Sequence, residues 1–204
     1  ASLSAVGFLT DRISLSIEKQ ASELLAADLR ISSPEPIPEE WIDLAKERKL
    51  DLASSQSFPS VVYSQEGNAL ARIKAVSSMY PLRGTVRISD NDINDEYEVK
   101  KIPSPSEVWV DQAILYRLNA KIGDEISIGN SDFKITAILR YRPDQSIGFA
   151  SLSPTVLMNI SSIPGTGLIT QGSRVNYSML VAGENNEVQT FSELMSVKVN
   201  DSAR

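Results

Sequence analysis

The sequence predicts an α+β fold in which a split sheet carries a second, small β-rich subdomain as an insertion. A strand, a helix and a strand follow one another within residues 28–63, and a strand and a helix return within residues 174–197. The region between them has the pattern of short strands separated by polar turns. This order is typical of an α+β chain that leaves a first layer and later returns to it.

The first elements predicted are a long helix, a strand and a shorter helix. Apolar residues recur every three or four positions from Leu9 to Ala27, which predicts one amphipathic helix over Phe8–Leu29. Residues 28–32 then read as a short strand, and a proline-rich turn follows that no helix can cross. A helix is expected after Pro38 and as far as Leu50, with Trp41, Leu44, Ala45 and Leu50 facing inward.

Two hairpins and a short helix are predicted next. Residues 51–80 are β-rich on both sides of the turn Glu66-Gly67-Asn68. Residues 88–106 form a polar loop with a strand at 96–101, and 107–110 is a further strand. A helix over 111–120 precedes a second hairpin at 121–141, whose turn is Gly129-Asn130-Ser131 and whose apolar residues alternate with polar ones.

The last part of the chain contains an uncharged stretch between Asp144 and Arg174. Prolines and glycines interrupt it, so it does not predict a membrane span. Residues 153–160 are expected to form one or two helical turns, residues 174–183 a strand, and residues 186–197 a final helix. We interpret the uncharged stretch as a loop and short helix on the second subdomain, or alternatively as a surface for a partner or an apolar substrate.

Composition excludes several classes of function. The 204 residues include no cysteine and no histidine, so there is no disulfide, thiolate metal site, Ser-His-Asp triad or imidazole base. The 26 acidic residues outnumber the 20 basic ones and give a net charge of −6. Duplex binding depends on clustered lysine and arginine, so no nucleic-acid partner is expected.

Short matches to the signatures of serine-lysine acyl enzymes are interpreted as coincidence. Ser16–Lys19 has the SxxK spacing and Ser89–Asn91 matches SDN, but KTG is absent and Lys121–Gly123 is its nearest counterpart. A second SxxK, Ser131–Lys134, falls in a predicted hairpin. A serine-lysine hydrolase is therefore the weakest hypothesis, and the chain is predicted not to be an enzyme.

One acidic loop partly matches a calcium-binding loop. Asp90, Asp92 and Asn94 match its first three ligand positions, but Asp95 stands where glycine is needed and Lys101 where a bidentate glutamate is needed. We interpret it as an acidic surface loop, with weak calcium binding as the alternative. The glycines of residues 164–172 lack the spacing of a phosphate-binding loop. No catalytic, cofactor-binding or metal-ligating residue is assigned, and no cofactor is expected.

The stretch EVWVDQAILYRLNAKIGDEISIGNSDFKITAIL at residues 107–139 resembles a segment of the extracytoplasmic domains of MacB/FtsX-type ABC transporter permeases. In that family a V-x-V strand and a short helix precede a G-D-x-I-x-I-G hairpin. SMYPLRG at 78–84 and the stretch 152–183 are similar to the YbbP-like branch, whose permeases pair with a separate YbbA-type ATPase. The resemblance runs from the N-terminal helix to about Gly183.

This resemblance implies a porter-like subdomain over residues 1–81 and 174–204, and an inserted Sabre-like β-rich subdomain over 82–173. It implies a non-catalytic periplasmic domain of an inner-membrane permease, which couples ATP-driven movement of membrane helices to periplasmic conformational change. The implied cargo is hydrophobic or lipid-like. The implied partners are a YbbA-type cytoplasmic ATPase, a second related periplasmic domain, and a soluble periplasmic protein such as an esterase.

The competing hypothesis is a free-standing periplasmic binding or adaptor protein with an apolar groove near residues 145–173. The uncharged residues 1–10 suit either hypothesis, as a processed terminus or as the outer end of a membrane helix. The permease hypothesis further predicts that both chain ends lie on the same side of the fold.

Overall fold

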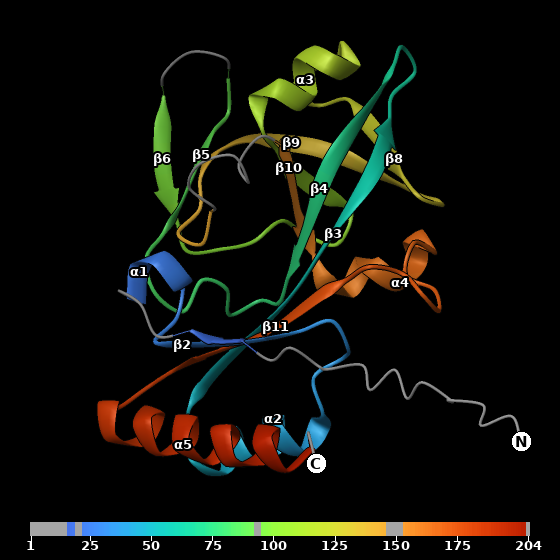
Figure 1. Cartoon of the computed structure of the whole chain (residues 1–204). Coiled ribbons are helices and arrows are strands. Elements are labelled where there is room, and N and C mark those ends of the chain that lie inside the picture. Colours follow the sequence, from blue (N-terminus) through green and yellow to red (C-terminus); the bar gives the residue numbers. More distant parts are fainter. Residues whose placement is uncertain (1–15, 19–21, 92–94, 146–152, 203–204) are drawn as a thin grey trace, which may run out of the picture.

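The computed structural model describes residues 16–18, 22–91, 95–145 and 153–202 (Figure 1). Its elements along the chain are β1 (Ser16–Glu18), α1 (Ser22–Leu25), β2 (Leu29–Ser33), α2 (Glu39–Glu47), β3 (Asp51–Tyr63), β4 (Asn68–Val76), β5 (Val86–Ser89), β6 (Glu96–Val99), β7 (Glu107–Val110), α3 (Gln112–Leu118), β8 (Glu125–Ile128), β9 (Ser131–Tyr141), β10 (Thr155–Asn159), the 3₁₀ turn η2 (Ile160–Ser162), α4 (Ile163–Thr166), β11 (Asn176–Ala182) and α5 (Asn185–Ser202).

The strands form one continuous mixed sheet in the order β1-β2-β11-β3-β4-β10-β7-β9-β5-β6, with β8 paired to both β3 and β9. The pairs β4–β10 and β7–β9 are parallel, and the other pairs are antiparallel. The α+β class is confirmed. Strands from both sides of the predicted subdomain boundaries, at 81/82 and 173/174, belong to this one sheet. The division of the chain into two subdomains at these positions stays a prediction.

The β3–β4 hairpin connects the two ends of the fold. Residues 51–57 of β3 pair with β11, whereas Val62 and Tyr63 at its other end pair with β8. β4 pairs with β3 on one side and β10 on the other. In Figure 1 the hairpin rises from the layer of β2 and β11 to the region of β8 and α3.

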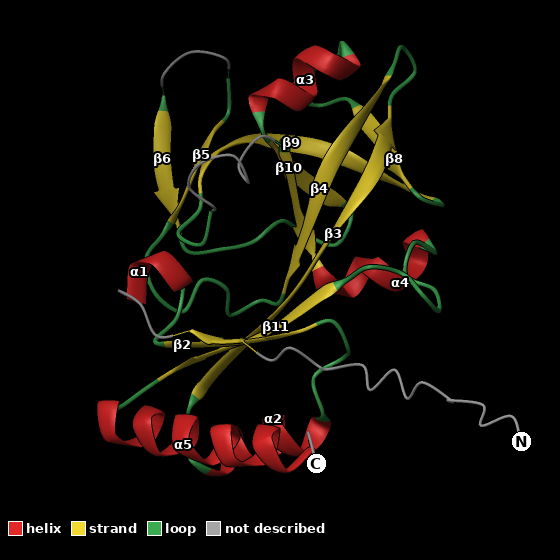
Figure 2. Ribbon diagram, in the orientation of Figure 1, coloured by secondary structure: helices red, strands yellow, loops and turns green. Residues whose placement is uncertain are grey.

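Three groups of buried apolar side chains fill the interior. Below the sheet, α2 and α5 pack against β2 and β11 (Figure 2), with Trp41, Ile31 and Phe191 at the centre. At the upper end, α3 covers the inner side of the β3–β4 hairpin through residues such as Ile114 and Leu118. A third group includes Tyr80 and Trp109, and its members come both from the segment before β2 and from strands such as β5 and β9.

Local signals explain the elements that the sequence predicts well. Helix α2 begins after Pro38, whose extended backbone ends the proline-rich turn, and Glu39 and Glu40 favour its N-terminal dipole. Trp41 and Ala45 are buried one turn apart, as expected. Leu50 is buried too, and Leu44 is half-buried.

Both predicted turns are confirmed. The Ser64 hydroxyl accepts from the Gly67 amide at 3.0 Å and donates to the Leu118 carbonyl at 2.7 Å, which ties the first turn to α3. In the second turn Gly129 has a φ of +59°, and a Cβ there would lie 2.1 Å from the Thr166 carbonyl oxygen. Glycine is therefore needed both for the conformation and for the close approach.

The prediction of a single helix over Phe8–Leu29 is wrong where it can be checked. Residues 16–18 form β1, which pairs antiparallel with β2, and the helix α1 covers only Ser22–Leu25. Ala26 has a φ of +59°, which ends α1, and its carbonyl accepts from the amides of Leu82 and Arg83. Pairing with a sheet edge overrides the helical periodicity here. Residues 1–15 and 19–21 lie outside the described residues, as do 203–204, so the predicted placement of the chain ends does too.

The helical turns predicted at 153–160 are also wrong, because Thr155–Asn159 form strand β10. β10 lies between β4 and β7, and Thr155–Met158 are all buried. A strand that is covered on both faces shows no alternation, so its apolar run resembles a buried helix. Strand β5 reaches into the predicted polar loop, whereas the predicted strand at 96–101 and the last helix are confirmed as β6 and α5.

The central position of β10 predicts a large effect of truncation. Leu157 is 0% exposed, so Leu157→Ala should lower the free energy of unfolding by about 2–5 kcal/mol in urea titrations. Leu70→Ala is the matched control, because Leu70 is 55% exposed in the adjacent strand β4 and should change stability by about 0.5 kcal/mol or less. Equal effects of the two substitutions would contradict the placement of β10.

Candidate functional site

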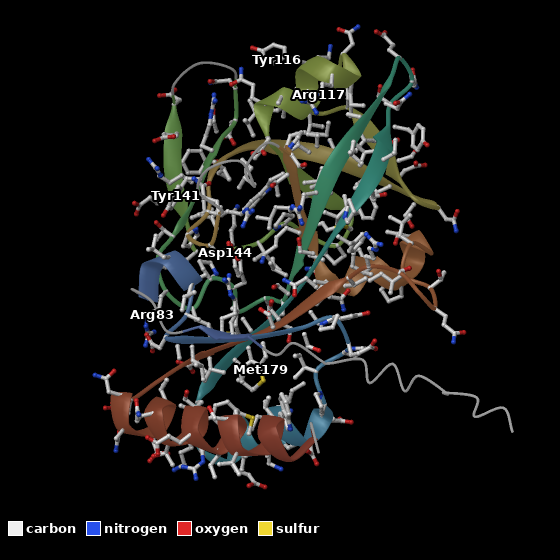
Figure 3. The ribbon with its side chains drawn as sticks, in the orientation of Figure 1. Arg83, Tyr116, Arg117, Tyr141, Asp144 and Met179 are labelled. Carbon is white, nitrogen blue, oxygen red and sulfur yellow. The ribbon has the colours of Figure 1, made fainter. Side chains whose placement is uncertain are left out.

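A buried carboxylate lies at the centre of the molecule. The Asp144 side chain is 0% exposed, and its Oδ2 atom lies 2.7 Å from the Lys74 ammonium. Its Oδ1 atom accepts from the Tyr80 hydroxyl at 2.5 Å and from the Arg142 guanidinium at 2.9 Å. We call these four residues the Asp144 cluster. Figure 3 shows Asp144 in the interior, between the upper strands and the layer of β2 and β11.

Segments far apart in the sequence build the Asp144 cluster. Lys74 comes from β4, where its ammonium also donates to the Ser55 hydroxyl of β3 at 3.2 Å. Tyr80 comes from the loop after β4, and its ring centroid lies 5.9 Å from the Lys74 ammonium. Arg142 and Asp144 follow directly after β9. The cluster therefore joins residues of the predicted porter-like part to residues of the predicted insertion.

The electrostatics of the cluster favour an ionised Asp144. Burial alone would raise the pKa of Asp144, but the charges of Lys74 and Arg142 and the hydrogen bonds from Lys74 and Tyr80 outweigh it and hold that pKa well below its usual range. Burial lowers the pKa of Lys74, although Asp144 opposes this. Burial and then the Asp144 charge raise the pKa of Tyr80, so this phenol stays a proton donor.

A second charged contact fixes the loop between β4 and β5. The Arg83 guanidinium donates to both carboxylate oxygens of Asp28, at 3.0 and 2.7 Å, and Asp28 also accepts from the Gly183 amide at 3.1 Å. Two parallel N–H···O bonds of this kind define the orientation as well as the contact. The loop is thus attached to the β2–β11 layer through Asp28, and through Tyr80 to the Asp144 cluster.

Sequence reasoning missed the Asp144 cluster. The one local signal is Lys74, which interrupts the otherwise apolar stretch Ile73–Val76 of β4, because a lysine there must find a buried partner. Asp111, also missed, accepts from the Thr155 amide at 2.5 Å, and burial raises its pKa. Neither aspartate stands in a recognisable motif.

The structure does not bring the serine-lysine motifs together. Ser16 lies in β1 at one end of the sheet order, and Ser89 lies in β5 near the other end. The Ser89 hydroxyl donates to the Asn91 carbonyl within a turn. Ser131 begins β9, where it is the ladder partner of Ile128. Lys19 lies outside the described residues.

The described residues of the acidic loop contact other residues of the same hairpin. Asp90 accepts from the Tyr97 hydroxyl at 2.8 Å, which also raises the pKa of that phenol. Asp92 and Asn94 lie outside the described residues. Within the ranges that the structure describes, no group of three or more acidic side chains could hold a metal ion.

The uncharged stretch divides into a central strand and a surface turn. β10 is buried in the sheet, while η2 and α4 lie beside it, and residues 146–152 lie outside the described residues. A pocket of about 320 Å³ is lined by Ile160, Ile163, Ile169 and Tyr177, together with Gln56, Pro164 and Gly167. This pocket is the structural feature that corresponds to the apolar groove of the competing hypothesis.

The family model described as "MacB-like periplasmic core domain" matches residues 1–203 of the sequence. The chain belongs to this family. The chain is therefore a periplasmic domain, and the resemblance to MacB-type domains noted in the sequence is confirmed. None of the described helices of this MacB-like domain combines the length and apolar character needed to cross a bilayer.

Individual relatives agree with the family assignment. The MacB-like domain is 24% identical over 189 residues to a protein of Escherichia coli K12 named "Uncharacterized ABC transporter permease YbbP". The match covers 93% of this chain but 22% of that permease, so the chain spans about a fifth of the relative's length.

Two solved structures share the fold. The extracellular domain of the noncanonical ABC-type transporter YknZ from Gram-positive bacteria has a TM-score of 0.51 and 11% identity, covering 76% of this chain and 78% of that one. The periplasmic region of MacB from Actinobacillus actinomycetemcomitans also gives 0.51 and 11%, covering 82% of this chain and 76% of that one. At this identity the likeness concerns the fold alone.

The Asp144 cluster leads to a prediction for stability. Asp144→Asn keeps the shape but leaves Lys74 and Arg142 without their counter-charge, so the free energy of unfolding should fall by about 3–5 kcal/mol in denaturant titrations. Asp43→Asn is the matched control, because Asp43 pairs with Lys46 on the exposed face of α2. This substitution should lower the free energy of unfolding by about 1 kcal/mol or less. A loss no larger than the control's would show that the cluster is dispensable.

The depressed pKa of Asp144 also predicts an acid dependence. In the folded state Asp144 stays ionised at pH values where the unfolded chain already binds the proton, so stability rises with pH in this range. Its contribution should be complete above about pH 4 and decline as the pH falls below that value. Urea titrations from pH 7 to pH 2 should show a smaller acid loss for Asp144→Asn than for the unsubstituted chain. Parallel curves would contradict the assignment.

Proposed function

We propose that this chain is the periplasmic domain of an inner-membrane ABC transporter permease and that it acts without catalysis. It would couple ATP-driven movement of membrane helices to a conformational change in the periplasm. The family assignment and the YbbP-named relative support the permease part of this proposal.

The observation that carries the coupling role is the unbroken series of packed and paired elements that leads from α5 to α3. α5 packs against β2 and β11, β11 pairs with β3, and the β3–β4 hairpin reaches α3. The Asp144 cluster ties the loop after β4 to the segment after β9, and the Arg83–Asp28 pair ties it to the start of β2. Close-packed interiors transmit displacement because they have few voids to absorb it.

The proposed partners follow from similarity to permeases that require an ATPase. We propose a YbbA-type cytoplasmic ATPase, a second related periplasmic domain and a soluble periplasmic partner such as an esterase. Hydrophobic or lipid-like cargo is part of the same proposal, with export or extraction as its outcome. The scattered positions of the serine-lysine motifs support a role without catalysis.

The second candidate function is that of a periplasmic binding or adaptor domain. The pocket of about 320 Å³ lined by Ile160, Ile163 and Ile169 favours it, because an apolar concavity with a polar neighbour such as Gln56 suits a small apolar ligand. The two functions differ in movement, because binding alone requires no response to ATP.

Distance measurements in the full-length permease test the coupling role. Tyr116 in α3 is 73% exposed and Val197 in α5 is 58% exposed, so both can be replaced by cysteine and spin-labelled without disturbing the core. With the ATPase and ATP, the 116–197 distance should stay constant, while the distance from 116 to a label in another periplasmic part of the permease should change. If the second distance is unchanged while ATP is hydrolysed, the coupling role is wrong and the binding role is favoured.

A further inference from the structure

A groove of about 940 Å³ lies between the β2–α2 loop and the loop that precedes β11. Residues 32–36 line one side and residues 170–177 line the other. Ser57, Pro59 and Arg72 of the β3–β4 hairpin complete the lining. The groove is separate from the Asp144 cluster, and no sequence motif pointed to it.

Two arginines of this groove have no partner within the part of the chain that the structure describes. Arg72 and Arg174 both line it, and neither side chain forms a hydrogen bond or ion pair with a described residue. Four other arginines, at positions 48, 83, 87 and 142, each pair with a carboxylate. Arg117 in α3 also forms no hydrogen bond or ion pair with a described residue, but it lies outside this groove. In an acidic chain, with a net charge of −6, two uncompensated guanidinium groups in one concavity are unusual.

The surroundings of the two arginines favour an anion. The lining contains one carboxylate, Glu35, against two guanidinium groups. Ser57 and Asn176 also line the groove, and their hydroxyl and amide groups are neutral hydrogen-bond donors. Arg72 is half-buried in mid-strand, between Pro59 of β3 and Thr155 of β10, so its backbone is fixed. A cleft focuses the field of such charges and raises the local concentration of anions.

We propose that this groove is a binding site for a phosphate group held by Arg72 and Arg174. Inorganic phosphate or a phosphate monoester carries about −1.5 to −2 charges at pH 7, which balances two guanidinium groups better than a single carboxylate does. The phosphodiester of a lipid headgroup carries one negative charge and offers the same kind of acceptor oxygens. The guanidinium fork also matches its oxygens in a bidentate manner. The phosphate belongs either to a small soluble molecule or to an anionic lipid headgroup. This site is independent of the coupling role proposed above.

Titration of the 204-residue chain with inorganic phosphate tests the site. Heteronuclear NMR at constant ionic strength should show saturable shifts confined to residues 32–36, 57–59, 72 and 170–177. The double variant Arg72→Gln/Arg174→Gln should bind at least tenfold more weakly. Arg117→Gln in α3 is the matched control, because Arg117 is exposed and lies outside the groove, and it should bind as the unsubstituted chain does. If the double variant unfolds, the single variant Arg174→Gln replaces it in the test, because Arg174 lies in an exposed loop.

Vesicles distinguish the two sources of phosphate. Cosedimentation with phosphatidylglycerol vesicles, but not phosphatidylcholine vesicles, that is lost in the arginine variant would assign the site to a lipid headgroup. Saturation by free phosphate without vesicle binding would assign it to a soluble ligand. If neither probe binds, or if the arginine variant and the unsubstituted chain bind both probes equally, the site does not exist.

Discussion

The arrangement of the molecule depends on one constraint, which is that the buried charge of Asp144 must be compensated. Moving a carboxylate from water into the interior costs several kcal/mol unless opposite charges and donors surround it. Lys74, Tyr80 and Arg142 meet this need from two separate segments of the chain. Because these side chains all contact one carboxylate, the segment after β4 is fixed in position relative to the segment after β9. Tyr80 also belongs to the third apolar group, with Trp109, so the charged cluster and this group share a side chain.

Local patterns predicted most of the elements, and the failures share a physical reason. Three elements carry their own signals: α2 has an acidic first turn, α3 has apolar residues at helical spacing, and the β8–β9 hairpin has a glycine turn. β10 was missed because pairing on both edges and burial on both faces remove the alternation that marks a strand. β1 was missed because its structure depends on β2, which follows it in the sequence. The Asp144 cluster could not be predicted, since 70 residues separate Lys74 from its partner.

The contrast between paired and unpaired cations links the cluster to the groove. Arg83 and Arg142 form ion pairs within the fold, with Asp28 and Asp144 respectively. Arg72 lies two residues before Lys74 on the same face of β4, yet it reaches the groove rather than the interior. In the proposed site, one strand therefore presents Lys74 for structure and Arg72 for a ligand. The two proposals together describe a periplasmic domain that would bind an anion on one surface and transmit movement through its sheet.

Native-state hydrogen exchange tests most directly whether the fold moves as one body. Amides of β2 and β11, at one end of the sheet, are compared with amides of β7 and β9, at the other, over low urea concentrations. If the fold moves as one body, both sets exchange with the same opening free energy and the same urea dependence, equal to those of global unfolding. If the β7–β9 set opens at a lower free energy than the β2–β11 set, the two ends are separate cooperative units, and that result would contradict the account.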